Sequence, residues 1–177
     1  IKHRGPDGCG YHMSEDMSAG LGHRRLTIVD KNEKANQPMS NETERVWVSF
    51  NGEIYNHVQL RQKLEKLGHT FKTSHSDTEV LLHGYEQWGI TGLLKRIHGD
   101  WAFSLLDEDK ETLYLSRDRM GVKPLYFHVS DTSVTFGSEI KALLEDKDVP
   151  REIEAVSMYH YLSLLSVPAP LTMFKQI

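Results

Sequence analysis

The sequence has little of what marks several large classes of protein. Its 177 residues include a single cysteine, so no internal disulfide framework can form, and a reducing cytoplasm is the expected location. No apolar run approaches the roughly 18 residues that span a bilayer, and no secretory signal is visible. The formal net charge is −4, with no basic block, so neither nucleic acid nor a membrane is expected as a partner.

The chain also lacks the residue spacings that are typical of metal and phosphate sites. His3, His23, His75 and His98 are scattered, so they are interpreted as structural or surface residues, and no metal site is expected. Two arginines lie in segment 117–121, but no glycine-rich loop leads into a helix there. A turn held by ion pairs is the prediction for that segment.

The patterns that are present predict a mixed α and β chain. Residues 46–50 alternate between apolar and other side chains, as a strand does. A helix is expected after Asn56, whose side chain can cap it, and Gly68 should end it. Ser76 and Glu79 have the spacing of a capping box at the start of another helix, which Gly89 should close.

Later segments predict hairpins and further helices. Strands are expected over 101–106 and 112–116, then over 124–129 and 133–136, each pair joined by a polar turn. Short helices are expected over 93–97, over 138–144 with Ser138 as its cap, and over 153–165. Strands that arrive as hairpins form antiparallel sheets, and helices must cover their buried faces. The predicted fold class is therefore layered α+β.

Five residues have the chemistry to hold a small zwitterionic substrate. The guanidinium of Arg25 suits a carboxylate, and Asp77, beside a helix start, suits an ammonium group. The side-chain amide of Asn51 and the backbone N–H of Gly52 can point at one developing oxyanion, since glycine lets a backbone donor approach closely. Glu53 can accept a hydrogen bond from a substrate amide.

Each of these assignments has a simpler alternative. An Asn-Gly pair after a strand is more often a turn, Arg25 beside another arginine is more often solvated or paired, and Asp77 is more often only part of a helix start. Cys9 is the one possible thiol nucleophile. It lies in a glycine-rich segment with no base or helix terminus evident nearby, so it is interpreted as a loop cysteine.

Taken together, eight blocks in order resemble the glutaminase domain of glutamine-hydrolysing asparagine synthetases. The resemblance covers essentially the whole chain. The blocks are His3–Gly8, Gly22–Asp30, Gln37–Met39, Asn51–Asn56, Ser76–Glu79, Gly99–Phe103, Arg117–Tyr126 and Gly137–Leu143.

The resemblance implies a class II glutamine amidotransferase with an N-terminal-nucleophile fold, a four-layer αββα sandwich of two mainly antiparallel sheets. It implies that Arg25 binds the carboxylate of L-glutamine, that Asp77 binds its ammonium group, and that Asn51 and Gly52 form the oxyanion hole. Glu53 becomes a further glutamine contact, and Ile28 and Val29 become a backbone wall of the pocket. In the family an N-terminal cysteine attacks the glutamine amide, and its own α-amine acts as the base.

The same resemblance predicts how the chain is organised. Residues 1–146 correspond to the amidotransferase domain, without its first strand, first helix and nucleophile. Residues 147–177 correspond to a linker toward an absent synthetase domain that uses ATP and Mg²⁺, while the glutaminase domain needs no cofactor of its own. The synthetase domain is the expected partner, and a homodimer is possible.

Because Cys9 follows the first block instead of preceding it, it does not inherit the role of nucleophile. The 177 residues alone are therefore expected to be inactive. Two alternatives stay open: a class II amidotransferase that amidates another acceptor, and a non-catalytic glutamine-binding module.

Overall fold

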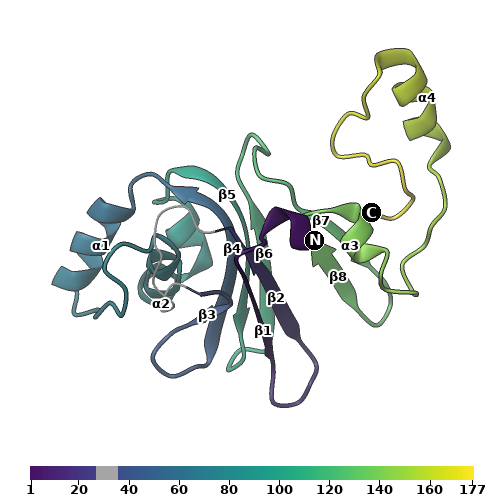
Figure 1. Ribbon diagram of the computed structural model, residues 1–177. Helices are drawn as coiled ribbons and strands as arrows, with labels where there is room; N and C mark the ends of the chain where they lie inside the picture. Colours follow the sequence, from purple (N-terminus) through teal and green to yellow (C-terminus); the bar gives the residue numbers. More distant parts are fainter. Residues whose placement is uncertain (27–35) are drawn as a thin grey trace. The chain divides into compact units, whose positions relative to one another are not determined.

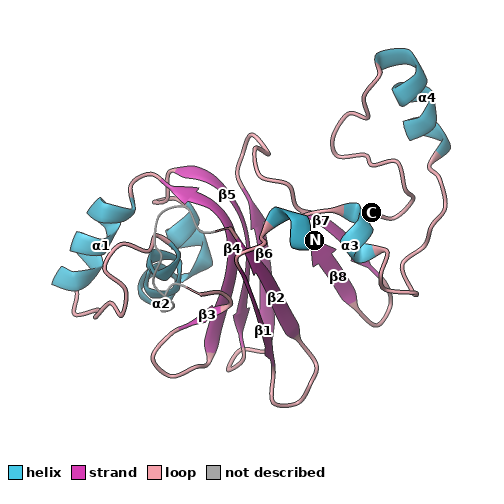
Figure 2. Ribbon diagram, in the orientation of Figure 1, coloured by secondary structure: helices cyan, strands magenta, loops and turns pink. Residues whose placement is uncertain are grey.

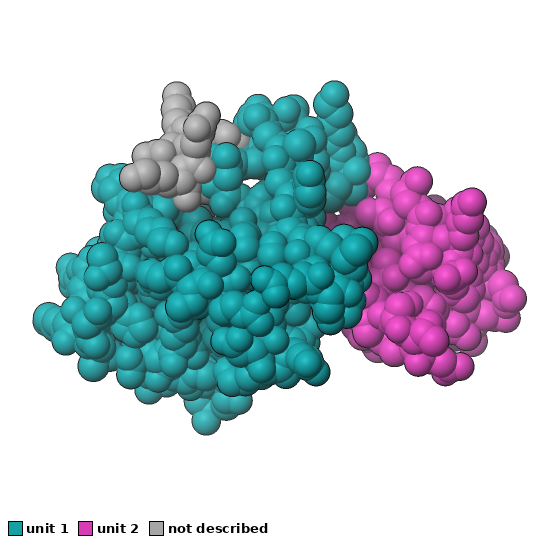
Figure 3. Space-filling model, turned by 90° about the horizontal axis from the view of Figure 1, so that it is seen from below, with its two compact units in different colours: residues 1–123 teal, residues 124–177 magenta. Residues whose placement is uncertain are grey.

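A computed structural model describes residues 1–26 and 36–177 (Figure 1). The chain forms two compact units, residues 1–123 and residues 124–177, which Figure 3 colours separately. The predicted division at residues 146 and 147 concerns the organisation of a longer protein and stays a prediction. Within the described residues, no helix has the length and apolarity needed to cross a membrane.

The first unit is built on a four-stranded antiparallel sheet. Its strands follow the spatial order β3 (Met39–Ser40), β4 (Val46–Ile54), β5 (Gly99–Asp107) and β6 (Thr112–Arg117). Strands β4 and β5 pair over their whole lengths, from Val46 opposite Asp107 to Ile54 opposite Gly99. The predicted strand at 46–50 and the predicted hairpin of 101–106 with 112–116 are confirmed.

Two helices, α1 (His57–Lys66) and α2 (Thr78–Leu94), lie on one side of this sheet (Figure 2). Alternate residues of β4 point toward them, so that the core contains Val48 and Phe50 from the strand with Leu64 and Leu81 from the helices. The predicted break at Gly89 is confirmed, because its φ of 66° interrupts the helix. A separate helical segment follows the kink and ends at Leu94, so the predicted short helix is present but lies earlier than the predicted range 93–97.

The other side of the sheet is covered by an antiparallel hairpin of β1 (Gly8–Met13) and β2 (Gly20–Arg25), which follows the short 3₁₀ helix η1 (Lys2–Arg4). The ring of His12 stacks on that of Trp47 at 3.7 Å with an interplanar angle of 9°. Nδ1 of His23 lies 3.2 Å from Oγ of Ser49. The α+β class with antiparallel sheets is therefore confirmed. The described part of this unit shows three of the four predicted layers.

The second unit contains the hairpin of β7 (Tyr126–Val129) and β8 (Val134–Gly137), followed by α3 (Ile140–Leu143) and α4 (Ala155–Leu164). The predicted hairpin and helices are present. Ser138 is not the cap of α3, however, because Glu139 occupies that position without a side-chain bond. Helix α4 is capped by Glu154, whose carboxylate accepts from the backbone N–H of Val156 at 3.2 Å.

The predicted cap of α1 is wrong. Asn56 precedes the helix, but its side chain makes no capping bond. Instead its Nδ2 donates to the carbonyl of Arg96 at 2.8 Å, and its Oδ1 accepts from the backbone N–H of His98 at 2.9 Å. The amide therefore holds the segment that enters β5. Helix α1 ends at Lys66, and Gly68, which was predicted to end it, has a positive φ of 99°.

The predicted capping box of α2 is also wrong. The residue before the helix is Asp77, and it makes no side-chain capping bond. The carboxylate of Glu79 turns back to the preceding loop, where it accepts from the backbone N–H of Lys72 at 2.6 Å and from that of Thr73 at 2.9 Å. Buried backbone donors in a loop need hydrogen-bond partners as much as those of a helix do. Here the carboxylate of Glu79 bonds to the loop and not to the start of the helix.

A buried hydrogen bond ties α2 to the turn between β5 and β6. The hydroxyl of Tyr85 donates to Oδ2 of Asp107 at 2.6 Å, and Lys110 Nζ donates to the same oxygen at 2.6 Å. We expect Tyr85→Phe to lower the free energy of unfolding by about 1–3 kcal/mol, because a hydrogen bond to a buried charged group is lost. Urea unfolding measures this. Tyr11→Phe is the control, since Tyr11 is 87% exposed; equal midpoints for both variants would contradict the expectation.

The packing of His23 against β4 predicts a loss of stability in mild acid. Burial, together with the nearby charge of Arg25, lowers the pKa of His23 to about 4. An unfolded histidine has a pKa near 6.5, so the unfolded state takes up the proton first as the pH falls below that value. The contribution of His23 to stability is therefore full above pH 6.5 and is lost toward pH 4, by about 2–3 kcal/mol. Urea unfolding at pH 7 and at pH 4.5 measures this. Between the two pH values, the free energy of unfolding should fall less for His23→Gln than for the native chain. The exposed His75→Gln should behave like the native chain.

Candidate active site

The Asn-Gly pair lies inside strand β4 and is not a turn. Asn51 is opposite Ala102 and Gly52 is opposite Trp101 in the ladder with β5. A Cβ on Gly52 would lie 2.1 Å from the carbonyl oxygen of Asp100, so only glycine fits where the two strands approach. The alternative interpretation as a tight turn is therefore wrong.

The side-chain amide of Asn51 is the most unusual polar group of the site. Its Nδ2 is buried and has no hydrogen-bond partner among the described residues. A buried donor without a partner costs about 1–3 kcal/mol, so such groups are rare unless a ligand or water satisfies them. The amide lies on the face of β4 that Ser49 shares, because side chains alternate along a strand.

Arg25 lies at the end of β2, on the face that is directed toward β4. His23 and Arg25 are two residues apart, so they share one face of β2. The hairpin contacts β4 in a regular register. His12, which pairs with Leu21, stacks on Trp47, and His23, two residues after Leu21, contacts Ser49, two residues after Trp47. The same progression directs Arg25 toward the end of β4 that carries Asn51.

A chain of hydrogen bonds links Arg25 to the start of α2. Nη1 of Arg25 donates to Oδ1 of Asn36 at 2.5 Å. The next residue, Gln37, accepts from the backbone N–H of Phe50 at 2.6 Å and donates to Oγ1 of Thr78 at 3.3 Å. The segment 36–37 therefore bridges the hairpin, β4 and α2 around the candidate site.

Asp77 is joined to the end of β4. Its Oδ2 accepts from the backbone N–H of Ile54 at 2.9 Å. Burial raises the pKa of Asp77, and the hydrogen bond from Ile54 offsets this only in part. A partly buried carboxylate with one such donor is suited to a cationic ligand group. Glu53, between Gly52 and Ile54, is exposed.

The remaining candidates give a mixed outcome. Ile28 and Val29 lie outside the described residues, so their predicted role stays a prediction. Cys9 is not in a loop as predicted: it lies in β1, opposite Arg24, with an exposed side chain. Asn36 and Gln37 belong to the site but were not predicted from the sequence, because neither follows a helical or strand period. Gln37 stood out only as part of a family block.

The site thus presents a guanidinium, an unsatisfied amide and a partly buried carboxylate around the end of one strand. A cation, a neutral donor and an anion in this order complement a small molecule with a carboxylate, a polarisable carbonyl and an ammonium group. The arrangement can bind and orient such a molecule and stabilise negative charge that develops on its carbonyl oxygen. The described residues bring Asn51, Gly52 and Asp77 to one end of β4, with Arg25 connected to them through segment 36–37.

Comparison with known proteins agrees with this chemistry. Residues 1–177 match the model of the glutamine amidotransferase domain family. The chain is 42% identical over 174 residues to asparagine synthetase 1 of Bacillus subtilis, a match that covers 98% of the chain and 26% of that protein. It is 44% identical over 147 residues to asparagine synthetase 2 of Arabidopsis thaliana, covering 82% of the chain and 24% of that protein.

A solved structure shares the fold. The glutamine phosphoribosylpyrophosphate amidotransferase of B. subtilis, complexed with ADP and GMP, aligns with a TM-score of 0.58 and 28% identity over 70% of this chain and 28% of that chain. The chain spans about a quarter of the length of the asparagine synthetases that it matches. It belongs to the glutamine amidotransferase domain family, as a class II domain that corresponds to part of the glutamine-hydrolysing asparagine synthetases.

Proposed function

We propose that this chain is the glutamine-hydrolysing domain of a larger cytoplasmic enzyme that makes asparagine from aspartate, glutamine and ATP. The observation that supports it most directly is the buried Nδ2 of Asn51, which has no partner among the described residues. An oxyanion that forms on the glutamine amide during hydrolysis would satisfy this donor. The identity of 42% to a glutamine-hydrolysing asparagine synthetase supports the choice of substrate.

Each site residue has one role in this proposal. Arg25 binds the α-carboxylate of L-glutamine and Asp77 binds its α-ammonium group, so the amino acid is fixed at both charges. Asn51 and the backbone N–H of Gly52 stabilise the oxyanion. Glu53, together with Ile28 and Val29, makes further contacts to the substrate.

The thiol that attacks glutamine is assigned to a cysteine outside these 177 residues. In the family mechanism the nucleophile uses its own α-amine as the base, which requires an N-terminal residue. The nitrogen of Cys9 belongs to a peptide bond within β1, so it has no basic lone pair. Cys9 is also exposed, and because it pairs with Arg24 its side chain lies on the face of the hairpin opposite to that of His23 and Arg25.

The acceptor is assigned by similarity. The asparagine synthetases are more similar in sequence than the phosphoribosylpyrophosphate amidotransferase, at 42% against 28% identity. A synthetase domain that binds ATP and Mg²⁺ is therefore the proposed partner of this domain. The structural match to the phosphoribosylpyrophosphate enzyme supports a second candidate, in which the same glutaminase domain supplies ammonia to a different acceptor.

The assignment of the nucleophile predicts that the 177-residue chain has no glutaminase turnover. A steady-state assay of glutamate release measures this on the native chain and on Cys9→Ala. Both should equal the blank, because Cys9 is the one thiol of the sequence and has no free α-amine to act as its base. Clear turnover by the native chain that Cys9→Ala abolishes would refute the assignment.

The binding and oxyanion roles predict different kinetic effects in the parent enzyme. Arg25→Met should raise KM for glutamine roughly tenfold or more, because a charge-assisted contact to the carboxylate is lost. Asn51→Ala should lower kcat by about 10²–10³, because its donor acts on the charge of the transition state. Glutaminase kinetics of the full-length enzyme measure both parameters.

Two controls separate these effects from misfolding. Synthesis from free ammonia bypasses glutamine, so both variants should retain it. Arg119→Met removes an arginine that is exposed in the structure and should leave both parameters unchanged. An Asn51→Ala enzyme with native kcat would exclude the oxyanion role, and an Arg25→Met enzyme with native KM would exclude carboxylate binding.

A further inference from the structure

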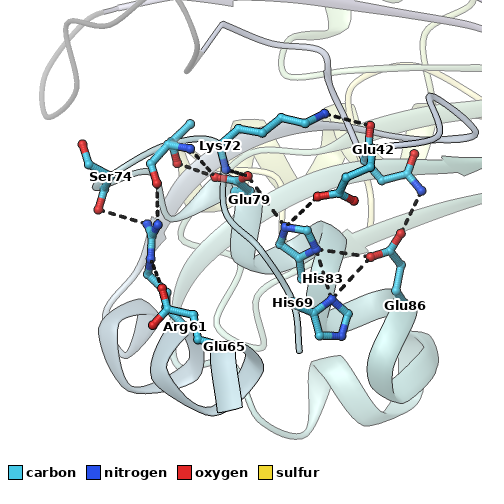
Figure 4. A network of polar contacts seen from close by, with 11 residues as sticks. Glu42, Arg61, Glu65, His69, Lys72, Ser74, Glu79, His83 and Glu86 are labelled. Carbon is cyan, nitrogen blue, oxygen red and sulfur yellow. Dashed lines mark hydrogen bonds and ion pairs between the residues drawn. The ribbon is translucent and has the colours of Figure 1, made fainter. Parts of the chain in front are cut away.

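Three ligand atoms, which the proposed glutaminase function does not use, converge beside helix α2 (Figure 4). Nδ1 of His69 lies 3.3 Å from Nδ1 of His83. Oε2 of Glu86 lies 3.2 Å from the same atom of His83 and 3.8 Å from that of His69. The same atom of each residue takes part in both of its contacts, so the three atoms form one compact triangle.

The outer contacts of the two histidines direct their lone pairs into this triangle. Nε2 of His69 lies 3.0 Å from Oε1 of Gln87. That oxygen can only accept, so the ring proton of His69 is on Nε2 and its Nδ1 carries a lone pair. Nε2 of His83 is buried and lies 3.7 Å from Oε1 of both Glu79 and Glu42. Facing two carboxylates, it carries a proton in preference to a lone pair.

The triangle therefore places two imidazole nitrogens and one carboxylate oxygen around a common point. When Nδ1 of His83 is deprotonated, all three atoms carry a lone pair or negative charge. In that state the three atoms repel one another unless a cation lies between them. We propose that His69, His83 and Glu86 form a binding site for a divalent transition-metal ion, with Zn²⁺ as the best match.

The distances fit that ion. In a tetrahedral zinc site with bonds of about 2.1 Å, neighbouring ligand atoms are roughly 3.4 Å apart. The three separations of 3.2, 3.3 and 3.8 Å lie close to that value. Two nitrogens and one oxygen form a donor set suited to zinc, and water can fill the fourth position.

Neighbouring residues already orient the three ligands. Nδ2 of Asn41 donates to Oε1 of Glu86 at 2.8 Å, which turns the other carboxylate oxygen toward the histidines. Gln87 orients His69, and the ring of Phe71 packs edge-on against His83 at 4.5 Å between centroids. Metal sites in proteins rely on such outer contacts to fix ring orientation and tautomer. His69 follows α1 and the other two ligands lie on α2, so an ion here would cross-link the two helices.

A proton is the competing occupant. If His83 were doubly protonated, Glu79, Glu42 and Glu86 would all stabilise the imidazolium (Figure 4). Lys72, a cation of the same network, donates to the backbone carbonyl of Asn41 at 3.2 Å. Burial lowers the pKa of His83, but its contacts with Glu79 and Glu86 outweigh this and raise the pKa to about 9. Metal and proton thus compete for one position, and binding should weaken as the pH falls.

Equilibrium dialysis of the full chain against buffered Zn²⁺, with metal analysis of both compartments, tests the proposal. We expect about one zinc per native chain. His69→Gln and Glu86→Gln should each weaken binding by about tenfold or more, because each removes a ligand. His98→Gln is the matched control, since it removes an exposed histidine outside the cluster and should bind like the native chain.

Far-ultraviolet circular dichroism confirms that each variant is folded. If His69→Gln does not fold, two measurements still test the proposal: zinc binding by Glu86→Gln, and the visible spectrum of Co²⁺ added to the native chain. Tetrahedral cobalt with nitrogen ligands has intense d–d bands. A cluster that binds a proton instead would give no zinc above the level of the blank and no such bands. That result, or equal zinc binding by the native chain, both ligand variants and the control, would overturn the proposal.

Discussion

The antiparallel ladder between β4 and β5 is the constraint on which the rest of the first unit depends. Nine residue pairs run without interruption from Val46 and Asp107 to Ile54 and Gly99. At its far end the strands approach so closely that each carries a glycine. A Cβ on Gly52 would lie 2.1 Å from the carbonyl oxygen of Asp100, and one on Gly99 would lie 2.1 Å from that of Glu53. The reciprocal close contacts position the candidate oxyanion donors on a rigid sheet, not on a loop.

Much of this architecture could be predicted from local patterns. Alternation over 46–50 fixed one face of β4, and polar turns between apolar runs identified both later hairpins. The Asn-Gly pair was also recognised as a candidate, although its position inside a strand was not evident, since the same dipeptide more often forms a turn. Local signals were sufficient for the pairing of consecutive strands, but not for the caps of α2 and α3.

Prediction failed where a side chain takes a partner far along the chain. Asn56 has the composition of a helix cap, yet it binds backbone groups of Arg96 and His98, about 40 residues away. Arg25 was selected for its chemistry, but its link through Asn36 to the rest of the site has no periodic signal. Cys9 looked like a loop residue because glycines flank it. Of the two, Gly10 instead lets β1 approach Gln37 closely, where a Cβ would lie 2.2 Å from the carbonyl oxygen.

The first turn of α2 shows how hydrogen-bond donors separate a structural carboxylate from one suited to a ligand. Asp77 and Glu79 are two residues apart, and burial alone would raise the pKa of both carboxylates. Glu79 accepts from two backbone N–H groups and from the hydroxyl of Thr73, and with His83 nearby these lower its pKa to about 2. Asp77 has the N–H of Ile54 from another element, and its pKa stays raised. A buried carboxylate with few hydrogen bonds is stabilised most by a cationic ligand group. This agrees with the proposed role of Asp77, which is to bind the ammonium group of glutamine.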